Sequence, residues 1–398
     1  SDPIELDPGI SNHYVSEAII NQIFDYFIRL DDSLKPIPWI AESWDVSPGE
    51  LDYEFKVKTG IKFHNGDPLT VEDIKFTFDR IKSPSLNSPL SDEINSIKYI
   101  EIIDENKIRF HLKYQYPPFL YTIFRQIVPK TYIARVGDES FKKNPVGSGP
   151  YIFKSWEPGK EVVLEKNENY WAGKPNFSKI FFIPFDDDNE RLARVKEGDI
   201  DIALEVDSPL LEKLMNEKNI NINETKGLSY YYLGFSCKTP VYKDVRFRKA
   251  FYHSINWDEL IGEKFGTYGI NRVYSIIPDV LWPDDLEYLK SKVLEFNPEK
   301  SVKLLNELKS EKIINDSFRP TIYCVNDPHR EEFVATIADL FKKNTGYVME
   351  SYSLPWETLD EKTQKGEVGI FFSAWIDKPD PDFYAYSLLH GKSPQNDC

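Results

Sequence analysis

The run Phe55–Phe76 constrains the fold of this chain more than any other segment. Around its start, Tyr53, Phe55 and Val57 alternate with charged residues, which is the pattern of a strand with one buried and one solvated face. Asn65-Gly66 then indicates a tight turn, because glycine adopts positive φ without a steric penalty. The run therefore predicts a strand and a turn, and the residues that follow predict a helix.

The predicted helix has a start signal of its own. Thr70 can cap its N-terminus, and Asp73 stands at the capping-box position, where aspartate is a weaker choice than glutamate. His64 and Asn65 in the turn could suggest catalysis, but we interpret them as part of the corner between strand and helix. The apolar side of the helix would consist of Val71, Ile74, Phe78 and Ile81.

The composition predicts a globular protein of more than one lobe. A chain of 398 residues is too long to fold around one ordinary hydrophobic core, so we expect two or three lobes. No apolar stretch approaches the ~20 residues of a membrane span. The net charge of −16 argues against nucleic acid or an anionic membrane as the partner. Aromatic residues make up 14% of the chain, and some could line an adaptable ligand cavity.

The start of the chain and its cysteines leave alternatives open. No signal-like segment opens the sequence, so we expect either a cytosolic chain or one that is already processed. The three cysteines, Cys237, Cys324 and Cys398, lack the spacing of a metal site. Cys237 and Cys324 could form a disulfide or remain as two reduced buried thiols. The histidines show no ligand spacing either, and we predict no metal and no cofactor.

Enzyme motifs are absent or unconvincing. The sequence lacks the glycine-rich nucleotide motifs, GxSxG and HExxH. Ser140–Lys143 matches SxxK and Lys58–Gly60 matches KTG, but the order is reversed and no Ser-Asp-Asn accompanies them. Asp186–Asp188 lacks the glycine turn and distal glutamate of a calcium loop, and a solvated loop explains it better. We therefore predict no catalytic residue.

The second half of the chain has the sequence pattern of an α/β region, with recognisable helix starts and an apolar strand. Asp244 can cap a helix over Val245–Ser254. Asn297-Pro298 and Asp327-Pro328 each combine an N-cap residue with a proline at the first helical position. Val368–Trp375 is almost entirely apolar, which is typical of a strand buried on both faces.

The strand-turn-helix run resembles the signature of the solute-binding proteins of peptide and nickel ABC importers, known as family 5. Further segments resemble motifs of the same family, and they follow the same order over nearly the whole chain. The resemblance implies that most of these motifs serve turns and lobe packing rather than ligand contacts. The segments are Leu6-Asp7-Pro8, Pro38–Trp44, Gly147–Tyr151, Asn167–Trp171, Gly198–Ala203, Tyr232–Phe235, Asp244–Ala250 and Trp375–Asp382.

The resemblance implies an α/β, two-lobed fold of the type II periplasmic-binding-protein class with an extra α/β subdomain. Residues 1–30 and 145–228 would form lobe 1, residues 31–144 the extra subdomain, and residues 229–398 lobe 2. Family members return to lobe 1 after the region of Trp375–Asp382, whereas this sequence stops at Cys398. We expect a fragment or processed chain, or final strands supplied in another way.

Asp377 is the first candidate for ligand contact. It follows the predicted strand that ends at Trp375, and α/β sheets bind ligands beyond the carboxyl ends of their strands. A carboxylate there would pair with the α-ammonium of a peptide, a bond worth about 1.5–3 kcal/mol when desolvated. The family resemblance at this motif implies the same role. The alternative is a turn aspartate ahead of Lys378-Pro379.

Arg330 is the second candidate. It falls in the first turn of the helix that Asp327 would cap. There the guanidinium of Arg330 and the free backbone N–H groups of the helix could together hold a carboxylate. Dipeptide receptors of the family use an arginine in this neighbourhood for the C-terminus of the ligand. A surface arginine paired with Glu331 or with another neighbour is the alternative.

Aromatic residues supply the remaining candidates. In a strand, Tyr230 and Tyr232 share one side and Tyr231 takes the other, and one side should reach the cleft. Trp375 could wall the cavity or belong to the core. Asn12 and Tyr14 follow the opening motif and are weaker candidates.

These readings favour a binding protein that performs no chemistry. The resemblance implies a monomeric, extracytoplasmic receptor for oligopeptides or dipeptides, in the periplasm or on the outer face of the cytoplasmic membrane, with a lipid anchor as an option. Its partners would be a small peptide and an ABC permease. The alternatives are a receptor for a nickel chelate, haem or sugar, a peptide-sensing receptor without transport, and, furthest from the pattern, a peptidase.

Overall fold

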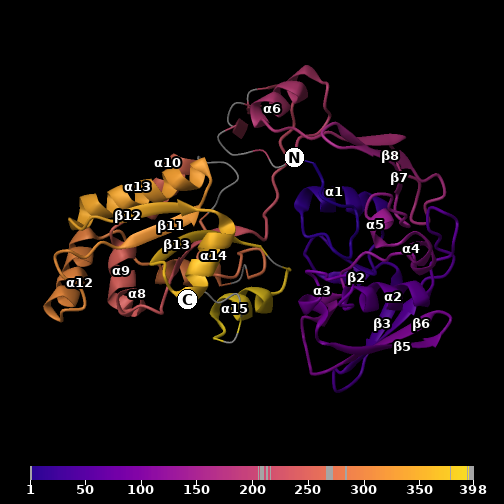
Figure 1. Cartoon of the computed structure of the whole chain (residues 1–398), viewed down its shortest axis with the longest axis horizontal. Coiled ribbons are helices and arrows are strands. Elements are labelled where there is room, and N and C mark those ends of the chain that lie inside the picture. Colours follow the sequence, from indigo (N-terminus) through magenta and orange to yellow (C-terminus); the bar gives the residue numbers. More distant parts are fainter. Residues whose placement is uncertain are drawn as a thin grey trace. The chain divides into compact units, whose positions relative to one another are not determined.

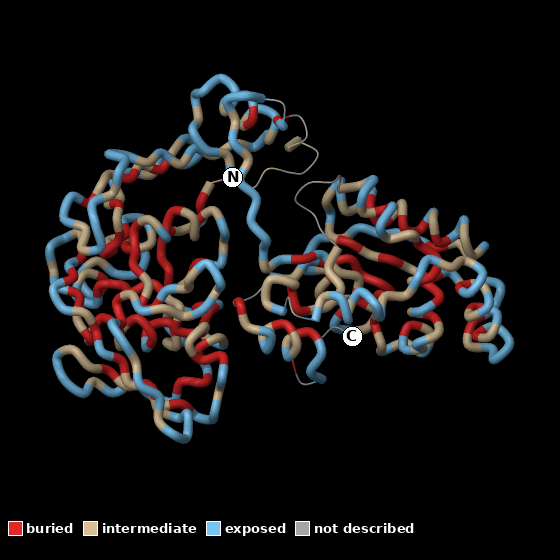
Figure 2. Tube along the Cα trace, turned by 180° about the vertical axis from the view of Figure 1, so that it is seen from behind, coloured by how far each residue is buried: buried red, intermediate tan, exposed pale blue. Residues whose placement is uncertain are grey.

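The computed structural model describes residues 2–204, 206, 210–211, 214–215, 217–265, 272–282, 285–376, 378–391 and 393 (Figure 1). The chain divides into two compact units, Ser1–Arg191 and Leu192–Cys398. Within each unit the buried residues gather in the interior (Figure 2). No helix in the described ranges has the length and apolar character needed to cross a membrane.

The strand-turn-helix run forms the core of the first unit, as predicted. Tyr53, Phe55 and Val57 are buried on one side of β4 (Asp52–Val57), and Gly66 has a φ of 91° in the turn. The Asp73 carboxylate accepts a hydrogen bond from the Thr70 N–H at 2.9 Å. The helix α2 (Val71–Ile81) then packs on an antiparallel sheet with the order β3 (Ala41–Val46), β4 (Asp52–Val57), β6 (Lys107–Leu112), β5 (Ile97–Asp104).

A second sheet completes the first unit. Its three antiparallel strands are β7 (Tyr151–Glu157), β8 (Glu161–Lys166) and β9 (Lys179–Phe182), and α1 (Tyr14–Ile23) packs against β7. α6 (Asp188–Glu197) crosses the boundary between the units. The smaller elements are β1 (Ile28–Leu30), β2 (Pro36–Pro38), η1 (Asp92–Ile94), α3 (Phe119–Thr122), α4 (Lys130–Val136) and α5 (Asp138–Phe141).

A buried carboxylate joins three of the family-like motifs. Asp25 is 3% exposed, and its Oδ1 accepts from Trp39 Nε1 at 2.9 Å and from the Tyr170 hydroxyl at 2.7 Å. Its Oδ2 accepts from Ser148 Oγ at 3.0 Å and from Trp171 Nε1 at 2.8 Å. Burial, followed by the nearby Asp25 charge, raises the pKa of Tyr170, so this hydroxyl remains a donor. These motif residues therefore hold the unit together.

The glycine motif packs in the same region. A Cβ on Gly147 would lie 2.0 Å from the carbonyl oxygen of Ile23, so only glycine fits there. His64 contacts this motif through Nε2, which lies 3.0 Å from the Gly149 carbonyl oxygen, and burial lowers the pKa of its imidazole. The interpretation of His64 as part of a corner agrees with these contacts.

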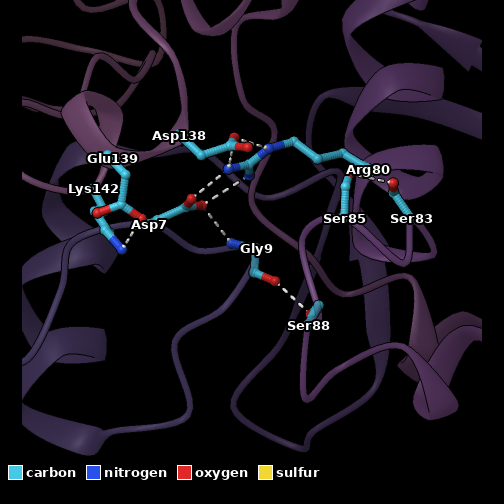
Figure 3. A network of polar contacts seen from close by, with 9 residues as sticks. All are labelled: Asp7, Gly9, Arg80, Ser83, Ser85, Ser88, Asp138, Glu139 and Lys142. Atoms are coloured by element: carbon cyan, nitrogen blue, oxygen red, sulfur yellow. Dashed lines mark hydrogen bonds and ion pairs between the residues drawn. The ribbon is translucent and has the colours of Figure 1, made fainter.

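An ion-pair network ties the opening motif to the core of the first unit (Figure 3). Arg80 Nη1 and Nη2 donate to the two oxygens of Asp7 at 3.0 and 2.5 Å, and Asp7 is fully buried. Arg80 also donates to Asp138 at 2.6 Å from Nη2 and 3.0 Å from Nε. Burial opposes the charge of Arg80, but the bonds to both carboxylates outweigh it and raise the pKa of the guanidinium.

The second unit is built on a mixed sheet. β10 (Tyr230–Phe235) is antiparallel to β13 (Ile370–Trp375), which is parallel to β11 (Thr321–Val325). The edge strand β12 (Glu350–Leu354) is parallel to β11. The described helices of this unit are α8 (Pro240–Lys243), α9 (Val245–His253), α10 (Trp257–Phe265), α11 (Leu286–Lys292), α12 (Pro298–Ser310), α13 (Pro328–Thr345), α14 (Trp356–Lys365) and α15 (Pro381–Leu389).

Successive residues of β13 enter different cores. Ile370 and Phe372 pack into the cluster that α9, α12 and α13 build, whereas Phe371 packs with Leu359 of α14. Because side chains alternate along a strand, these helices cover opposite faces of the sheet. This explains the apolar run of β13 and confirms the prediction of a strand buried on both sides.

The predicted helix starts are also confirmed. The side chains of Asp244, Asn297 and Asp327 accept from backbone N–H groups in the first turns of α9, α12 and α13. Cys237 and Cys324 are free thiols, as in the second alternative left by the sequence, but only Cys324 is buried and Cys237 is partly exposed. Cys398 lies outside the described residues.

Candidate functional site

Most of the predicted ligand contacts gather at one edge of the sheet in the second unit. β13 and β11 are parallel, so their last residues, Trp375 and Val325, lie at the same edge (Figure 1). β10 runs the other way and begins at this edge with Tyr230, which pairs with Trp375. Ligands of α/β proteins bind beyond the carboxyl ends of strands, so this edge is the candidate site.

The three tyrosines of β10 divide between the faces of the sheet as predicted. The rings of Tyr230 and Tyr232 contact each other edge to face at 6.2 Å. Tyr231 instead contacts Phe372, which belongs to the core under α13. The candidate site therefore has two sides with different chemistry.

The first side is an aromatic cluster that contains two unsatisfied donors. Tyr230 is 8% exposed and its ring stacks on Tyr384 at 6.1 Å. Burial raises the pKa of its hydroxyl, which therefore stays protonated. Neither the Tyr230 hydroxyl nor Trp375 Nε1 has a hydrogen-bond partner among the described residues, although both atoms are buried. Such groups destabilise the isolated fold, and nothing in the sequence pattern signals them.

The second side presents an open ring. Tyr231 is 47% exposed and stacks on Phe372 at 5.4 Å and on Phe265 at 6.4 Å. Phe333 completes the group at 4.8 Å from Phe372 and 5.2 Å from Phe265. Rings from β13 and α10 thus hold Tyr231, backed by a ring from α13, while part of Tyr231 faces solvent.

Arg330 lies over this open ring. Its backbone N–H donates to Asp327 at 2.9 Å, which places the side chain in the first turn of α13. Its guanidinium carbon is 5.3 Å from the centroid of the Tyr231 ring. Within the described ranges, no hydrogen bond or ion pair joins this guanidinium to another residue, so a pair with Glu331 is not formed. The contact with Tyr231 is a feature that the sequence did not reveal.

The remaining candidates stand apart from this edge or outside the described residues. Asp377 is among the residues that the structure does not describe. Asn12 and Tyr14 belong to the first unit, where Asn12 is exposed and Tyr14 is 50% exposed at the start of α1. No described group of three or more histidine, cysteine or acidic side chains has the geometry of a metal site.

Comparison with known proteins identifies the family. Residues 35–396 match the sequence profile of the bacterial extracellular solute-binding proteins, family 5. The chain belongs to this family. The family assignment made from the sequence motifs is confirmed, and the two-lobed α/β fold is the fold of these proteins.

Individual relatives of this family 5 protein agree with the assignment. It is 30% identical over 300 residues to a Brucella ovis protein that carries the name of ABC transporter peptide-binding protein, covering 73% of this chain and 55% of the relative. It is 27% identical over 320 residues to the oligopeptide-binding protein AppA of Bacillus subtilis, covering 77% of this chain and 57% of the relative. The chain thus spans about half the length of these relatives.

A solved structure gives the same picture of the fold. The crystal structure of NikZ from Campylobacter jejuni, in complex with Ni(L-His), superposes on this chain with a TM-score of 0.79. The two sequences are 26% identical, and the match covers 98% of this chain and 78% of NikZ.

Proposed function

We propose that this family 5 protein captures a short peptide outside the cytoplasm and delivers it unaltered to an ABC permease. Membership of the family and the names of the Brucella and Bacillus relatives support this. One observation at the site carries the proposal: an arginine to which no described acidic residue is paired lies beside an open aromatic ring at the carboxyl edge of the sheet. A peptide supplies both a carboxylate and apolar side chains for such a surface.

In this proposal each end of the peptide has its own recognition group. Asp377 pairs with the α-ammonium, and Arg330 binds the carboxylate, since an arginine fork matches carboxylate geometry. Tyr231 and Trp375 contact the body of the ligand, with Asn12 and Tyr14 on the opposing lobe. Residues 1–30 and 145–228 form that lobe, residues 31–144 the extra subdomain, and residues 229–398 the second lobe. Closure about a hinge then buries the peptide.

The proposed cellular location is supported by the description of the family as extracellular solute-binding proteins. We place the receptor in the periplasm or on the outer face of the cytoplasmic membrane, where a lipid anchor would keep it near the permease. It works as a monomer and turns nothing over. Incubation with a peptide pool, followed by mass spectrometry, should recover intact bound peptides. Cleaved products would contradict the proposal.

Calorimetry with peptides that have free termini tests the two recognition groups. Asp377→Asn should weaken binding about tenfold or more, because a charge-assisted bond is lost. Arg330→Met should have an effect of similar size on the same peptides.

Arg319→Met is the matched control for the arginine. Its guanidinium donates to the Asp316 and Phe318 carbonyl oxygens just before the amino end of β11, the opposite edge of the sheet. The affinity of the Arg319→Met variant for these peptides should equal that of the unaltered protein. Tight binding of Ni(L-His) without any peptide binding would replace peptides by metal chelates as the cargo.

A further inference from the structure

The contact between Tyr231 and Arg330 suggests a role for the tyrosine beyond lining the site. We infer that Tyr231 is a positioning residue. Its ring holds the flat face of the Arg330 guanidinium and leaves the N–H groups at the edge of that guanidinium free to bind the two oxygens of a carboxylate. The inference rests on the proposed function, because it assumes that Arg330 binds the ligand carboxylate. It concerns how that carboxylate is selected, which the family assignment does not address.

Two arginines with acidic partners show the contrasting arrangement, whereas Arg29 over Trp39 and Arg135 over Tyr132 resemble Arg330 in having a ring as neighbour. Arg80 donates to Asp7 and Asp138, and Arg246 donates to Asp244 and Glu311. In each case the edge of the fork is occupied, so no donor pair remains for a ligand. Arg330 instead has a ring as its neighbour, 5.3 Å from the guanidinium carbon.

The direction of the two interactions makes them compatible. A cation–π contact uses the flat face of the guanidinium, whereas a bidentate bond to a carboxylate uses N–H groups in its plane. An acidic residue would compete with the ligand carboxylate for those N–H groups. An aromatic ring restricts the side chain without that competition. Tyr231 can therefore reduce the freedom that Arg330 would otherwise lose when it binds the ligand.

The packing around Tyr231 is suited to this role. Phe372 and Phe265 stack on its ring, at 5.4 and 6.4 Å. Phe333, one turn along α13 from Arg330, packs on the same Phe372 at 4.8 Å. Residues three apart share one side of a helix, so the guanidinium and Phe333 meet the sheet side by side. The ring and the cation are thus held by the same core.

The test compares one tripeptide with a free C-terminal carboxylate and the same tripeptide with a C-terminal amide. Calorimetry gives the dissociation constant for each, and the ratio of amide to acid measures carboxylate selection. The variants are Tyr231→Phe, which keeps the ring, Tyr231→Leu, which removes it, Arg330→Met, and the double variant Tyr231→Leu with Arg330→Met. Thermal unfolding of each checks that the fold is intact.

We expect the unaltered protein and Tyr231→Phe to share the same ratio. Tyr231→Leu should lower the ratio by about threefold to fivefold, the effect of losing an exposed cation–π contact. Arg330→Met should bring the ratio close to one, and the double variant should match Arg330→Met because Tyr231 acts through the arginine.

Two results would overturn the inference while leaving the proposed function in place. One is a Tyr231→Leu variant that weakens acid and amide equally, since that describes a plain contact with the peptide. The other is a Tyr231→Leu variant that binds the acid and the amide as tightly as the unaltered protein does. If the unaltered protein binds neither peptide, the proposed function and the inference fall together.

Discussion

Arg80 in the first unit and Arg330 in the second occupy opposite chemical situations. Arg80 is 7% exposed, and both edges of its guanidinium donate to carboxylates, one of which belongs to the fully buried Asp7 (Figure 3). Arg330 is only partly buried, and its described neighbour is the ring of Tyr231. The guanidinium of Arg80 is filled by carboxylates of the fold, whereas no described residue fills that of Arg330, which lies at the carboxyl edge of the sheet and can serve a ligand.

The two arginines also differ in the process that their interactions stabilise, which is folding for Arg80 and ligand binding for Arg330. In the first unit the arginine neutralises a carboxylate that would otherwise be buried as an unpaired charge, so its role is completed by folding. In the second unit no described residue takes the N–H groups of Arg330, which remain for a later partner. Substitutions should therefore act on stability at one site and on affinity at the other.

The largest expected effect is on the stability of the first unit. Arg80→Met leaves Asp7 buried without its cation, and breaking a buried pair in this way costs about 3–5 kcal/mol. Arg330→Met should lower the free energy of unfolding by only about 0.5–1 kcal/mol, because it removes one exposed cation–π contact. Urea unfolding of both variants measures the contrast.

Asp7→Asn on the Arg80→Met background provides the control. It removes the stranded charge, so part of the lost stability should return. If Arg80→Met and Arg330→Met lowered stability equally, the distinction between filled and open forks would be wrong.

A smaller effect on stability is expected at alkaline pH, through the thiol of Cys324, whose pKa depends on the charge of Arg330. Burial raises the pKa of the Cys324 thiol on β11 from the ordinary 9.0 to about 11, with Glu331 and Asp327 raising it and Arg330 lowering it. Because the folded state holds the proton more tightly, this stability is complete below pH 9 and is lost as the pH rises towards 11. The loss should reach roughly 2 kcal/mol.

Unfolding as a function of pH tests this, with Cys324→Ala as the reference. The alkaline loss of stability should be less steep in that variant. Arg330→Met should raise the pKa of the thiol further, as seen in thiolate absorbance on a Cys237→Ser background. An unchanged pKa would mean that the Arg330 charge is already neutralised.

The smallest effect extends the comparison from arginines to tyrosines. The Tyr242 hydroxyl accepts from the Thr321 N–H at 2.9 Å, whereas the buried Tyr230 hydroxyl has no partner in the part of the chain that the structure describes. Tyr242→Phe should therefore destabilise the protein by about 1 kcal/mol, and Tyr230→Phe should stabilise it by a similar amount. Thermal unfolding without ligand measures both. Equal destabilisation by the two changes would indicate that Tyr230 has a partner in solution.

Local chemistry made much of the fold predictable from the sequence. The capping residues Asp244, Asn297 and Asp327 act within one turn, so their signals lie within a few residues of each other. The alternation in Tyr230–Tyr232 and the apolar run of β13 were equally readable, because each follows from the period of a strand. The family motifs added the fold class.

The site was predictable only in part. The position of Arg330 in the first turn of α13 followed from Asp327-Pro328. Its contact with Tyr231 did not, because the two residues meet only through the order β10-β13-β11, which long-range packing decides. The sequence also gave no sign that the Tyr230 hydroxyl and Trp375 Nε1 lack partners. Hydrogen-bond satisfaction depends on the assembled core rather than on any local pattern.

The Asp25 junction has a consequence for engineering this protein. One carboxylate receives donors from segments as distant in sequence as Trp39, Ser148 and Trp171. A chimera that imports residues 145–171 from a relative without matching positions 25 and 39 would strand an acid or an indole inside the fold. These parts must be exchanged as a set, and crossover points that respect this set should give folded hybrids.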